Sequence, residues 1–143
     1  MATRNGSAEW RGDLRGGNGT LSVGSGAFTG PFSFTSRFED GSGTNPEEMI
    51  AAAHAACFAM ATSAILAEEG HPVDSVKTTA DITLRFVDGA PTITKIDLTA
   101  EGKVPGIDEA HFQEVVEKAR QECLVSRALA GVGEITATAT FVS

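Results

Sequence analysis

Two cysteines, Cys57 and Cys123, are the side chains of this 143-residue chain best suited to covalent chemistry. They lie far apart in the sequence, so they form neither a CxxC redox motif nor a tight zinc knuckle. A thiolate can attack the O–O bond of a peroxide and become a sulfenic acid, which a second cysteine traps as a disulfide. The pair therefore suits a thiol redox reaction, provided that the fold brings the two sulfurs together.

The two thiols have different neighbours. Cys57 stands in an apolar stretch beside Ala56 and Phe58, where burial keeps a thiol neutral and a core role alone would explain it. Cys123 stands among polar residues that include Ser126. A purely structural thiol has less reason to be there, so Cys123 favours a chemical role for the pair.

Composition limits the partners of the chain. Its formal net charge is -8 and its lysines and arginines are scattered, so nucleic acid and anionic membrane surfaces are unfavourable partners. Residues 1–30 contain no apolar signal core, and we expect no apolar run as long as a membrane span. We therefore predict a cytoplasmic protein whose two thiols rest reduced, folded as one domain over residues 1–143.

The first half of the chain predicts three short strands and a long helix. The strands lie around Trp10, around residues 21–23 and over 32–38, and glycine turns between them indicate an antiparallel meander. Asn45 predicts a helix N-cap, with Pro46 and Glu48 in the positions of a capping box. The helix should end near Glu69, because Gly70 suits a left-handed C-terminal residue. Its interior is apolar nearly all round, which predicts burial on most sides.

The second half predicts a hairpin, a second helix and a last strand. Residues 75–87 and 92–103 alternate in polarity, with the Asp88-Gly89 turn between them and Ile96, Leu98 and Ala100 on one face of the second segment. A helix is expected from Asp108 through Cys123 to Leu129, and residues 135–142 alternate as a strand. The apolar stripe expected on this helix consists of Phe112, Val115, Val116 and Ala119. Clustered strands of this kind predict an α+β fold, βββ-α-ββ-α-β along the chain, with antiparallel sheets packed around the central helix.

Several motifs along the chain resemble the OsmC/Ohr family of osmotically inducible and organic hydroperoxide resistance proteins, and its OsmC branch in particular. The most specific is the long stretch that surrounds Cys57. The matching segments are AEWRGD at 8–13, SRFEDGSGTNPEEMIAAAHAACFAMA at 36–61, TTAD at 78–81, ITKIDL at 93–98, VPGID at 104–108, and Cys123 with Val125 and Ser126.

This resemblance implies a function and a set of site residues. Cys57 would be the peroxidatic thiol and Cys123 the resolving thiol, with Arg37 and Glu47 as their polar partners. It also implies an intertwined homodimer with two active sites at the subunit interface, and a dithiol reductant of the lipoyl type. One difference from the family pattern is Leu124, which stands where proline often follows the resolving cysteine.

The polar partners have physical roles that the residue types themselves suggest. A thiol with a reference pKa of about 8.5 is mostly neutral at pH 7, so Cys57 needs a cation to favour its thiolate. Arg37 keeps its charge when buried and donates several hydrogen bonds, although it also suits a solvated strand end. Glu47 can fix the guanidinium in a bidentate pair, although position alone makes it a first-turn acid that complements the helix dipole.

Helical geometry separates Glu47 from Cys57. Ten residues of straight helix span about 15 Å, so the two side chains cannot share one site within one helix. A two-fold dimer in which two copies of this helix cross antiparallel would place Glu47 of one subunit near Cys57 of the other. The small residues Ala51 to Ala53 lie midway between them and would permit close approach. We therefore expect composite active sites.

Other functions remain open on the sequence alone. His54 stands three residues before Cys57, on the same side of the helix, which would suit a cysteine hydrolase. His54, Cys57, His111 and Cys123 have the residue types of a metal site but no recognisable spacing. A redox sensor or small-molecule-binding protein of the same fold, without turnover, is a further alternative.

The interpretation that unites these observations is a peroxidase without a bound cofactor or metal. A hydroperoxide and a dithiol would give an alcohol, water and a disulfide, with Cys57 as nucleophile and Cys123 resolving. Arg37 would stabilise the thiolate and the leaving oxygen, and Glu47 would orient Arg37. Apolar neighbours of Cys57 favour organic hydroperoxides over hydrogen peroxide.

Overall fold

The structure is a computed structural model, and it describes residues 1–142. Contacts between residues divide the chain into two compact units. Unit 1 comprises residues 1–49 and unit 2 begins at Ile50, so the division falls after the first turn of the long helix. The two units are described separately below, and the single domain expected from the sequence stays a prediction.

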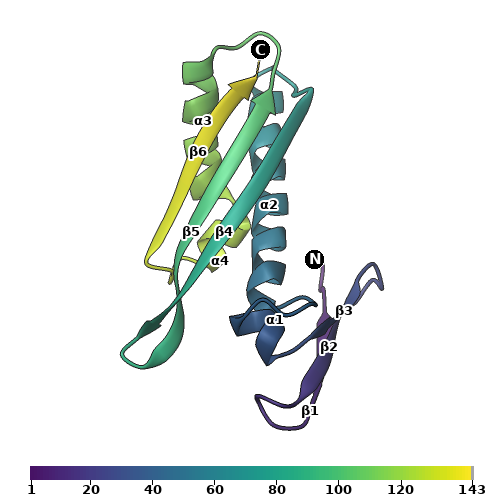
Figure 1. The fold of residues 1–143 in the computed structure, drawn as a ribbon. Helices are drawn as coiled ribbons and strands as arrows, with labels where there is room; N and C mark the ends of the chain where they lie inside the picture. Colours follow the sequence, from purple (N-terminus) through teal and green to yellow (C-terminus); the bar gives the residue numbers. More distant parts are fainter. Residues whose placement is uncertain (143) are drawn as a thin grey trace. The chain divides into compact units, whose positions relative to one another are not determined.

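Unit 1 contains an antiparallel meander of three strands (Figure 1). The strands are β1 (Gly6–Arg11), β2 (Asn18–Val23) and β3 (Thr29–Phe32), paired in the order β1-β2-β3. The three predicted strands are thus present. The third one ends at Phe32, however, and the prediction that it continues to Phe38 is wrong.

A short helix, α1 (Phe34–Phe38), replaces the end of the predicted strand. Ser33 caps it: the Ser33 hydroxyl accepts a hydrogen bond from the Ser36 backbone N–H at 3.1 Å, and the Ser36 hydroxyl accepts one from the Ser33 N–H at 2.8 Å. This reciprocal capping satisfies two N–H groups at the helix start and outweighs the strand-like alternation of the phenylalanines. Arg37 therefore lies in the last turn of a helix rather than at a strand end.

The long helix α2 runs over Pro46–Glu68 and begins where the sequence predicted. The Asn45 side chain accepts a hydrogen bond from the Glu48 N–H at 2.7 Å. The Glu48 carboxylate accepts one from the Thr44 hydroxyl at 2.8 Å instead of closing the capping box on Asn45. Gly70 follows the helix with φ of 86°, a left-handed conformation that favours glycine.

Helix α2 is much less buried than its composition predicted. Its buried residues are only His54, Phe58, Thr62, Ile65 and Leu66, which form one face. Met60 is 74% exposed. Residues 50–67 carry no charged side chain, so the expectation that no run reaches the length of a membrane span is wrong: by length and composition α2 could cross one, with a mean hydropathy of 1.8. A single chain therefore leaves an apolar helix flank uncovered.

Unit 2 is built on a sheet of three strands in the order β4-β5-β6. β4 (Ser75–Val87) and β5 (Ala90–Lys103) form the predicted hairpin, with Asp88 and Gly89 at φ of 50° and 81° in its turn. β6 (Glu134–Val142) pairs with β5 in parallel, so the prediction of purely antiparallel sheets is wrong here. The chain crosses back over the sheet through a helix between these strands, and such a crossover connects parallel strands.

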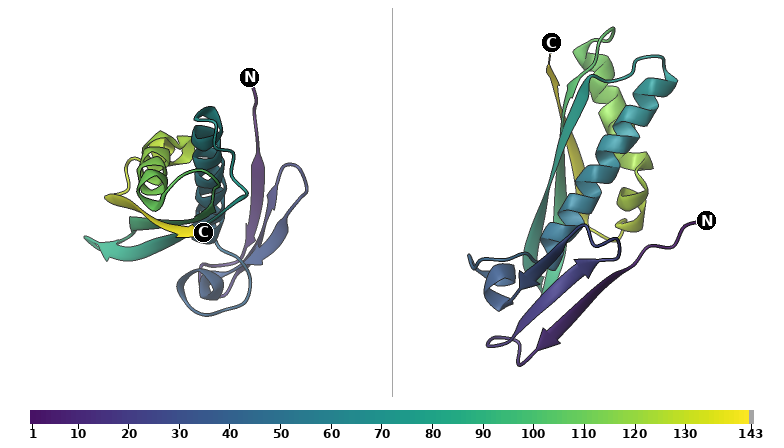
Figure 2. Two further views of the ribbon diagram at one scale, coloured as in Figure 1. Left: turned by 90° about the horizontal axis from the view of Figure 1, so that it is seen from above. Right: turned by 90° about the vertical axis from the view of Figure 1, so that its right-hand side faces the viewer.

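The core of unit 2 lies between this sheet and its helices. Helix α3 (Glu109–Glu122) packs on the face of the sheet that also carries α2 (Figure 2). The buried stripe predicted for α3 is confirmed, as is the buried face of β5. The stripe consists of Phe112, Val115, Val116 and Ala119, and the strand face of Ile96, Leu98 and Ala100.

The second helix does not run unbroken to Leu129 as predicted. It ends at Cys123, whose φ and ψ of −53° and 126° are not helical, and α4 (Leu124–Ala128) starts directly afterwards. The Cys123 N–H still donates to the carbonyl of Ala119 at 2.9 Å, closing α3. The break places a thiol at the junction of two helices.

Close packing of β5 against α3 predicts the effect of one methyl group. A Cβ added at Gly102 would clash with the ring of Phe112, which is fully buried. We expect Gly102→Ala to lower the free energy of unfolding by about 1–3 kcal/mol, as overpacked cores do. Gly131→Ala is the matched control, because no atom lies within 4 Å of its added Cβ. Urea unfolding measures both, and equal midpoints would contradict the packing argument.

Candidate functional site

The structure brings the two cysteines together in unit 2. Cys57 comes from α2 and is half-buried, whereas Cys123, at the junction of α3 and α4, is 1% exposed. Their thiols lie close enough for each to shift the pKa of the other, and they are not joined in a disulfide. Whether the fold brings the two sulfurs together could not be tested from the sequence.

Different surroundings shift the pKa values of the two thiols in opposite directions. Burial raises the pKa of Cys57, and the hydrogen bond with Cys123 raises it further, against weaker opposition from the N–H groups of Val125 and Leu124. Burial also disfavours the charged form of Cys123, but the Cys57 thiol and the N–H and hydroxyl of Ser126 outweigh it and lower the Cys123 pKa. The surroundings of the pair thus favour ionisation of Cys123 over ionisation of Cys57.

This charge distribution bears on the role predicted for Cys57. The groups that set both pKa values are thiols, backbone N–H groups and a hydroxyl. None of them is a cation, and a peroxidatic Cys57 thiolate needs one nearby. Unit 2 therefore supplies the two sulfurs but leaves the electrostatic part of the site to other groups.

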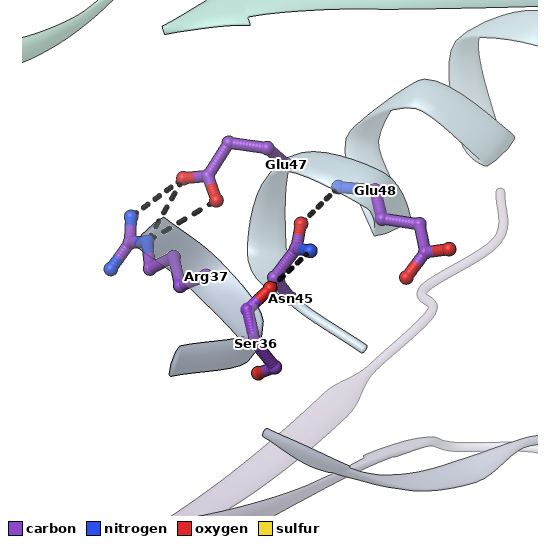
Figure 3. A network of polar contacts seen from close by, with 5 residues as sticks. All are labelled: Ser36, Arg37, Asn45, Glu47 and Glu48. Carbon is purple, nitrogen blue, oxygen red and sulfur yellow. Dashed lines mark hydrogen bonds and ion pairs between the residues drawn. The ribbon is translucent and has the colours of Figure 1, made fainter. Parts of the chain in front are cut away.

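Unit 1 holds the predicted Arg37–Glu47 pair. The Arg37 Nη2 donates to Glu47 Oε1 at 2.7 Å, and Nε lies 3.1 and 3.2 Å from the two carboxylate oxygens (Figure 3). Arg37 is in the last turn of α1 and Glu47 in the first turn of α2, where its side chain is only 13% exposed. This forked geometry fixes the plane of the guanidinium. Within residues 1–142, Arg37 Nη1 has no hydrogen-bond acceptor and remains available to a ligand.

Asn45 ties together the two helices that carry this ion pair. Its amide nitrogen donates to the carbonyl of Ser36 at 3.0 Å, while its amide oxygen caps α2 (Figure 3). Ser36 in turn donates to the carbonyl of Thr44 at 2.7 Å and is buried. One side chain thus holds the end of α1 against the start of α2, and so fixes the distance between Arg37 and Glu47.

A hollow of about 220 Å³ opens beside Arg37 in unit 1. Its lining is mostly aromatic and apolar, and consists of Trp10, Leu14, Phe32, Ser33, Phe34, Arg37 and Phe38. No motif in the sequence predicted a functional role for these aromatic residues. An apolar hollow with one guanidinium suits a ligand that has an apolar body and one polar end.

His54 does not face a cysteine as a hydrolase would require. Its Nε2 lies 2.7 Å from the hydroxyl of Ser126, and both residues are buried. Burial lowers the pKa of His54, so the ring is neutral at pH 7. Ser126 is a functional candidate that sequence reasoning gave no role, although its place three residues after Cys123, in the helix that Cys123 starts, was a usable signal.

The metal-site alternative has no support in the described part of the chain. Residues 1–142 contain no group of three or more His, Cys, Asp or Glu side chains arranged to hold an ion. His111 instead contacts the carboxylate of Glu69 at 2.6 Å. Of the four suggested ligands, the two that lie close together are the thiols of Cys57 and Cys123.

Two three-stranded sheets, a long helix bearing one thiol and a helix junction bearing the other define an α+β protein with a dithiol centre. The family described as OsmC-like protein matches residues 39–137. The chain belongs to this family, as its motifs suggested.

Named relatives place it in the OsmC branch. It is 49% identical over 127 residues to "Peroxiredoxin OsmC" of Escherichia coli, which covers 88% of this chain and 89% of the relative. It is 36% identical over 101 residues to "Organic hydroperoxide resistance protein" of Xanthomonas axonopodis pv. citri, 68% of each chain. Among solved structures, an OsmC-like protein of Mycoplasma pneumoniae has a TM-score of 0.75 at 16% identity, covering 99% of both chains, which supports the fold.

The buried neutral His54 predicts a pH dependence of stability. Its pKa is lowered in the folded chain and is near 6.5 when unfolded, so below about pH 6.5 the unfolded chain binds a proton that the folded chain does not. The stabilisation is complete above that pH and is lost as the pH falls, by up to about 1.4 kcal/mol per pH unit.

Urea unfolding of the reduced protein between about pH 7.5 and 5.5 measures this effect. His54→Gln should flatten the dependence, whereas the same substitution at the less buried His71 should leave it in place. An unchanged slope in His54→Gln would contradict the assignment.

Proposed function

We propose that this protein is a thiol peroxidase that reduces organic hydroperoxides to alcohols. The observation that carries the proposal is that two free thiols from distant segments, Cys57 and Cys123, lie close enough to shift each other's pKa. The names of its relatives, a peroxiredoxin and an organic hydroperoxide resistance protein, agree with this activity. Two free thiols also suit the reducing cytoplasm, where we place the protein.

The reaction proceeds in two sulfur steps. The Cys57 thiolate attacks the distal oxygen of the hydroperoxide, the O–O bond breaks, and the alkoxide takes a proton to leave as the alcohol. Cys57 is then a sulfenic acid. Cys123 attacks the Cys57 sulfur, water leaves, and a disulfide forms. An external dithiol, which we propose to be of the lipoyl type, reduces the disulfide by thiol exchange. No bound cofactor enters this cycle.

Arg37 and Glu47 supply the electrostatics of the first step. A guanidinium near Cys57 counteracts the burial that raises the Cys57 pKa, and stabilises the oxygen that leaves with negative charge. Glu47 holds Arg37 through its bidentate contacts and leaves Nη1 open for that oxygen. In this role the ion pair does more than complement the dipole of α2.

The hollow beside Arg37 supports the preference for organic hydroperoxides. Its aromatic lining can hold an alkyl or aryl group, while the peroxide oxygens lie toward the guanidinium. Hydrogen peroxide has no apolar part, so it gains nothing from these rings.

A homodimer would complete the site and cover α2. One face of α2 already packs in unit 2, and the other exposes apolar side chains, with Met60 74% exposed. Exposed apolar surface of this extent marks an interface. A membrane would have to surround the helix, which its packed face prevents. The uninterrupted helix also separates Glu47 from Cys57 by about 15 Å of rise, so we propose that each site combines Arg37 and Glu47 of one subunit with both cysteines of the other.

Peroxide turnover with defined variants tests the peroxidase function. With dihydrolipoamide as reductant, we expect wild type to consume cumene hydroperoxide over many cycles, and faster than hydrogen peroxide. Cys57→Ser should abolish turnover, and Arg37→Gln should lower kcat/KM by about a hundredfold, the usual effect of losing one transition-state donor. Cys123→Ser should react once and stall as the sulfenic acid. Wild type that forms the disulfide once and never turns over would instead be a redox sensor.

Mixed dimers test the composite site. Co-expression of Glu47→Gln and Cys57→Ser chains under different affinity tags yields a dimer with one doubly defective site and, if the sites are composite, one intact site. We expect this mixed dimer to regain about half the wild-type activity. Sites formed within one chain would each keep a defect, and activity would be about half that of the Glu47→Gln homodimer. A fully active monomer in dilute solution would also refute the composite site.

A further inference from the structure

Two buried polar side chains extend the dithiol centre beyond the groups that the peroxidase cycle uses. The His54 Nε2 lies 2.7 Å from the Ser126 Oγ. Ser126 follows Cys123 by three residues in the helix that Cys123 starts, and its hydroxyl lowers the pKa of the Cys123 thiol. His54 is fully buried, and Ser126 and Cys123 are 7% and 1% exposed. A continuous line of polar groups therefore runs from His54 through Ser126 and Cys123 to Cys57, all within unit 2.

The unpartnered nitrogen of His54 indicates which atom donates in the contact between His54 and Ser126. Its Nδ1 is buried and has no hydrogen-bond partner among residues 1–142. A neutral imidazole carries one hydrogen, and a buried N–H without an acceptor is rarer in proteins than a buried acceptor without a donor. The hydrogen is therefore on Nε2, which donates to Ser126 Oγ. The Ser126 hydroxyl hydrogen is then free to point at Cys123.

We propose that His54 is a positioning residue for the resolving step: it fixes the Ser126 hydroxyl as a hydrogen-bond donor to the Cys123 sulfur. The proposal rests on the peroxidase function above. If the hydroxyl instead donated to His54, the Cys123 thiolate would lose that donor. Nε2–H leaves the hydroxyl no such choice, because a donating nitrogen cannot accept.

The resolving step defines when this donor acts. The Cys123 thiol releases its proton to water, and its sulfur attacks the Cys57 sulfur of the sulfenic acid. The S–S bond forms as the S–O bond breaks, and the leaving hydroxide takes up a proton to become water. A donor fixed on Cys123 raises the fraction of attacking thiolate. It does not assist the first step, in which Cys57 attacks the peroxide.

A single-turnover experiment separates the two steps. One equivalent of cumene hydroperoxide is mixed with reduced protein, and the loss of peroxide reports the first step. Dimedone trapping followed by mass spectrometry reports the decay of sulfenic acid into disulfide, the second step. The variants are His54→Leu, which removes the donor, Ser126→Ala, which removes the hydroxyl, and His54→Gln, whose amide N–H can replace Nε2–H.

We expect His54→Leu and Ser126→Ala to slow disulfide formation by about tenfold, the effect of losing a hydrogen bond to a charged group. Peroxide loss should stay within about twofold of wild type, since Cys57 keeps its own contacts. The double variant should form the disulfide no more slowly than either single variant, because the two substitutions interrupt the same series of contacts between His54 and Cys123. His54→Gln should recover most of the rate.

Thr62→Val controls for packing, because Thr62 is a fully buried polar residue of α2 that bonds only to the carbonyl of Phe58. It should change neither step. Equal slowing of both steps in His54→Leu, or an unchanged second step in both single variants, would overturn the proposal. Wild type that forms the disulfide once without turning over would refute the peroxidase function alone, since the second step still reports on His54.

Discussion

The close approach of the Cys57 and Cys123 thiols links α2 to the junction of α3 and α4, and the other features of unit 2 hold the two sulfurs in place. Two thiols in contact at low exposure cannot both be charged, because each thiolate would repel the other. The structure resolves this by placing backbone N–H groups around Cys123 and leaving Cys57 without a cation of its own. These surroundings favour ionisation of the resolving sulfur, but peroxide reduction needs the attacking sulfur as the thiolate, and Arg37 is proposed to shift the preference toward Cys57.

Helix α2 carries residues of both the ion pair and the dithiol centre. Its first turn holds Glu47, which fixes Arg37, and its middle carries Cys57 and His54. One face follows the ordinary logic of a core helix, with Phe58, Ile65 and Leu66 buried. The opposite flank is just as apolar and is exposed, which costs free energy unless something covers it. In the homodimer that we propose, a second copy of the same helix would cover that flank and, by the antiparallel crossing, bring the cation of one chain to the thiol of the other.

Sequence reasoning succeeded where local signals agree with the tertiary structure and failed where they compete. Local signals predicted a single structure, and the correct one, at the N-cap Asn45, the Asp88-Gly89 hairpin and the buried stripe of α3. Residues 33–38 carry two competing signals. Alternating phenylalanines suggest a strand, but the Ser33 capping box stabilises a helix. The parallel pairing of β6 depends on a long-range crossover, which local patterns do not encode. The helix break at Cys123 has no proline or glycine that would have predicted it. The residue types of the dithiol centre were thus predictable, while the Ser126 contact that distinguishes the two sulfurs required the fold.

The two sulfurs need a thiolate at different moments, and the proposed groups divide that work. In the first step a permanent cation is appropriate, because charge builds up on oxygen and must be neutralised as the O–O bond breaks. In the second step the nucleophile is already beside its target, so a neutral donor on Cys123 is enough, and a second cation would hold the charge on Cys123 when Cys57 needs it. A neutral histidine acting through a serine meets this requirement. The burial that lowers the His54 pKa is therefore consistent with its place in the line: it keeps the ring uncharged and its influence on Cys123 modest.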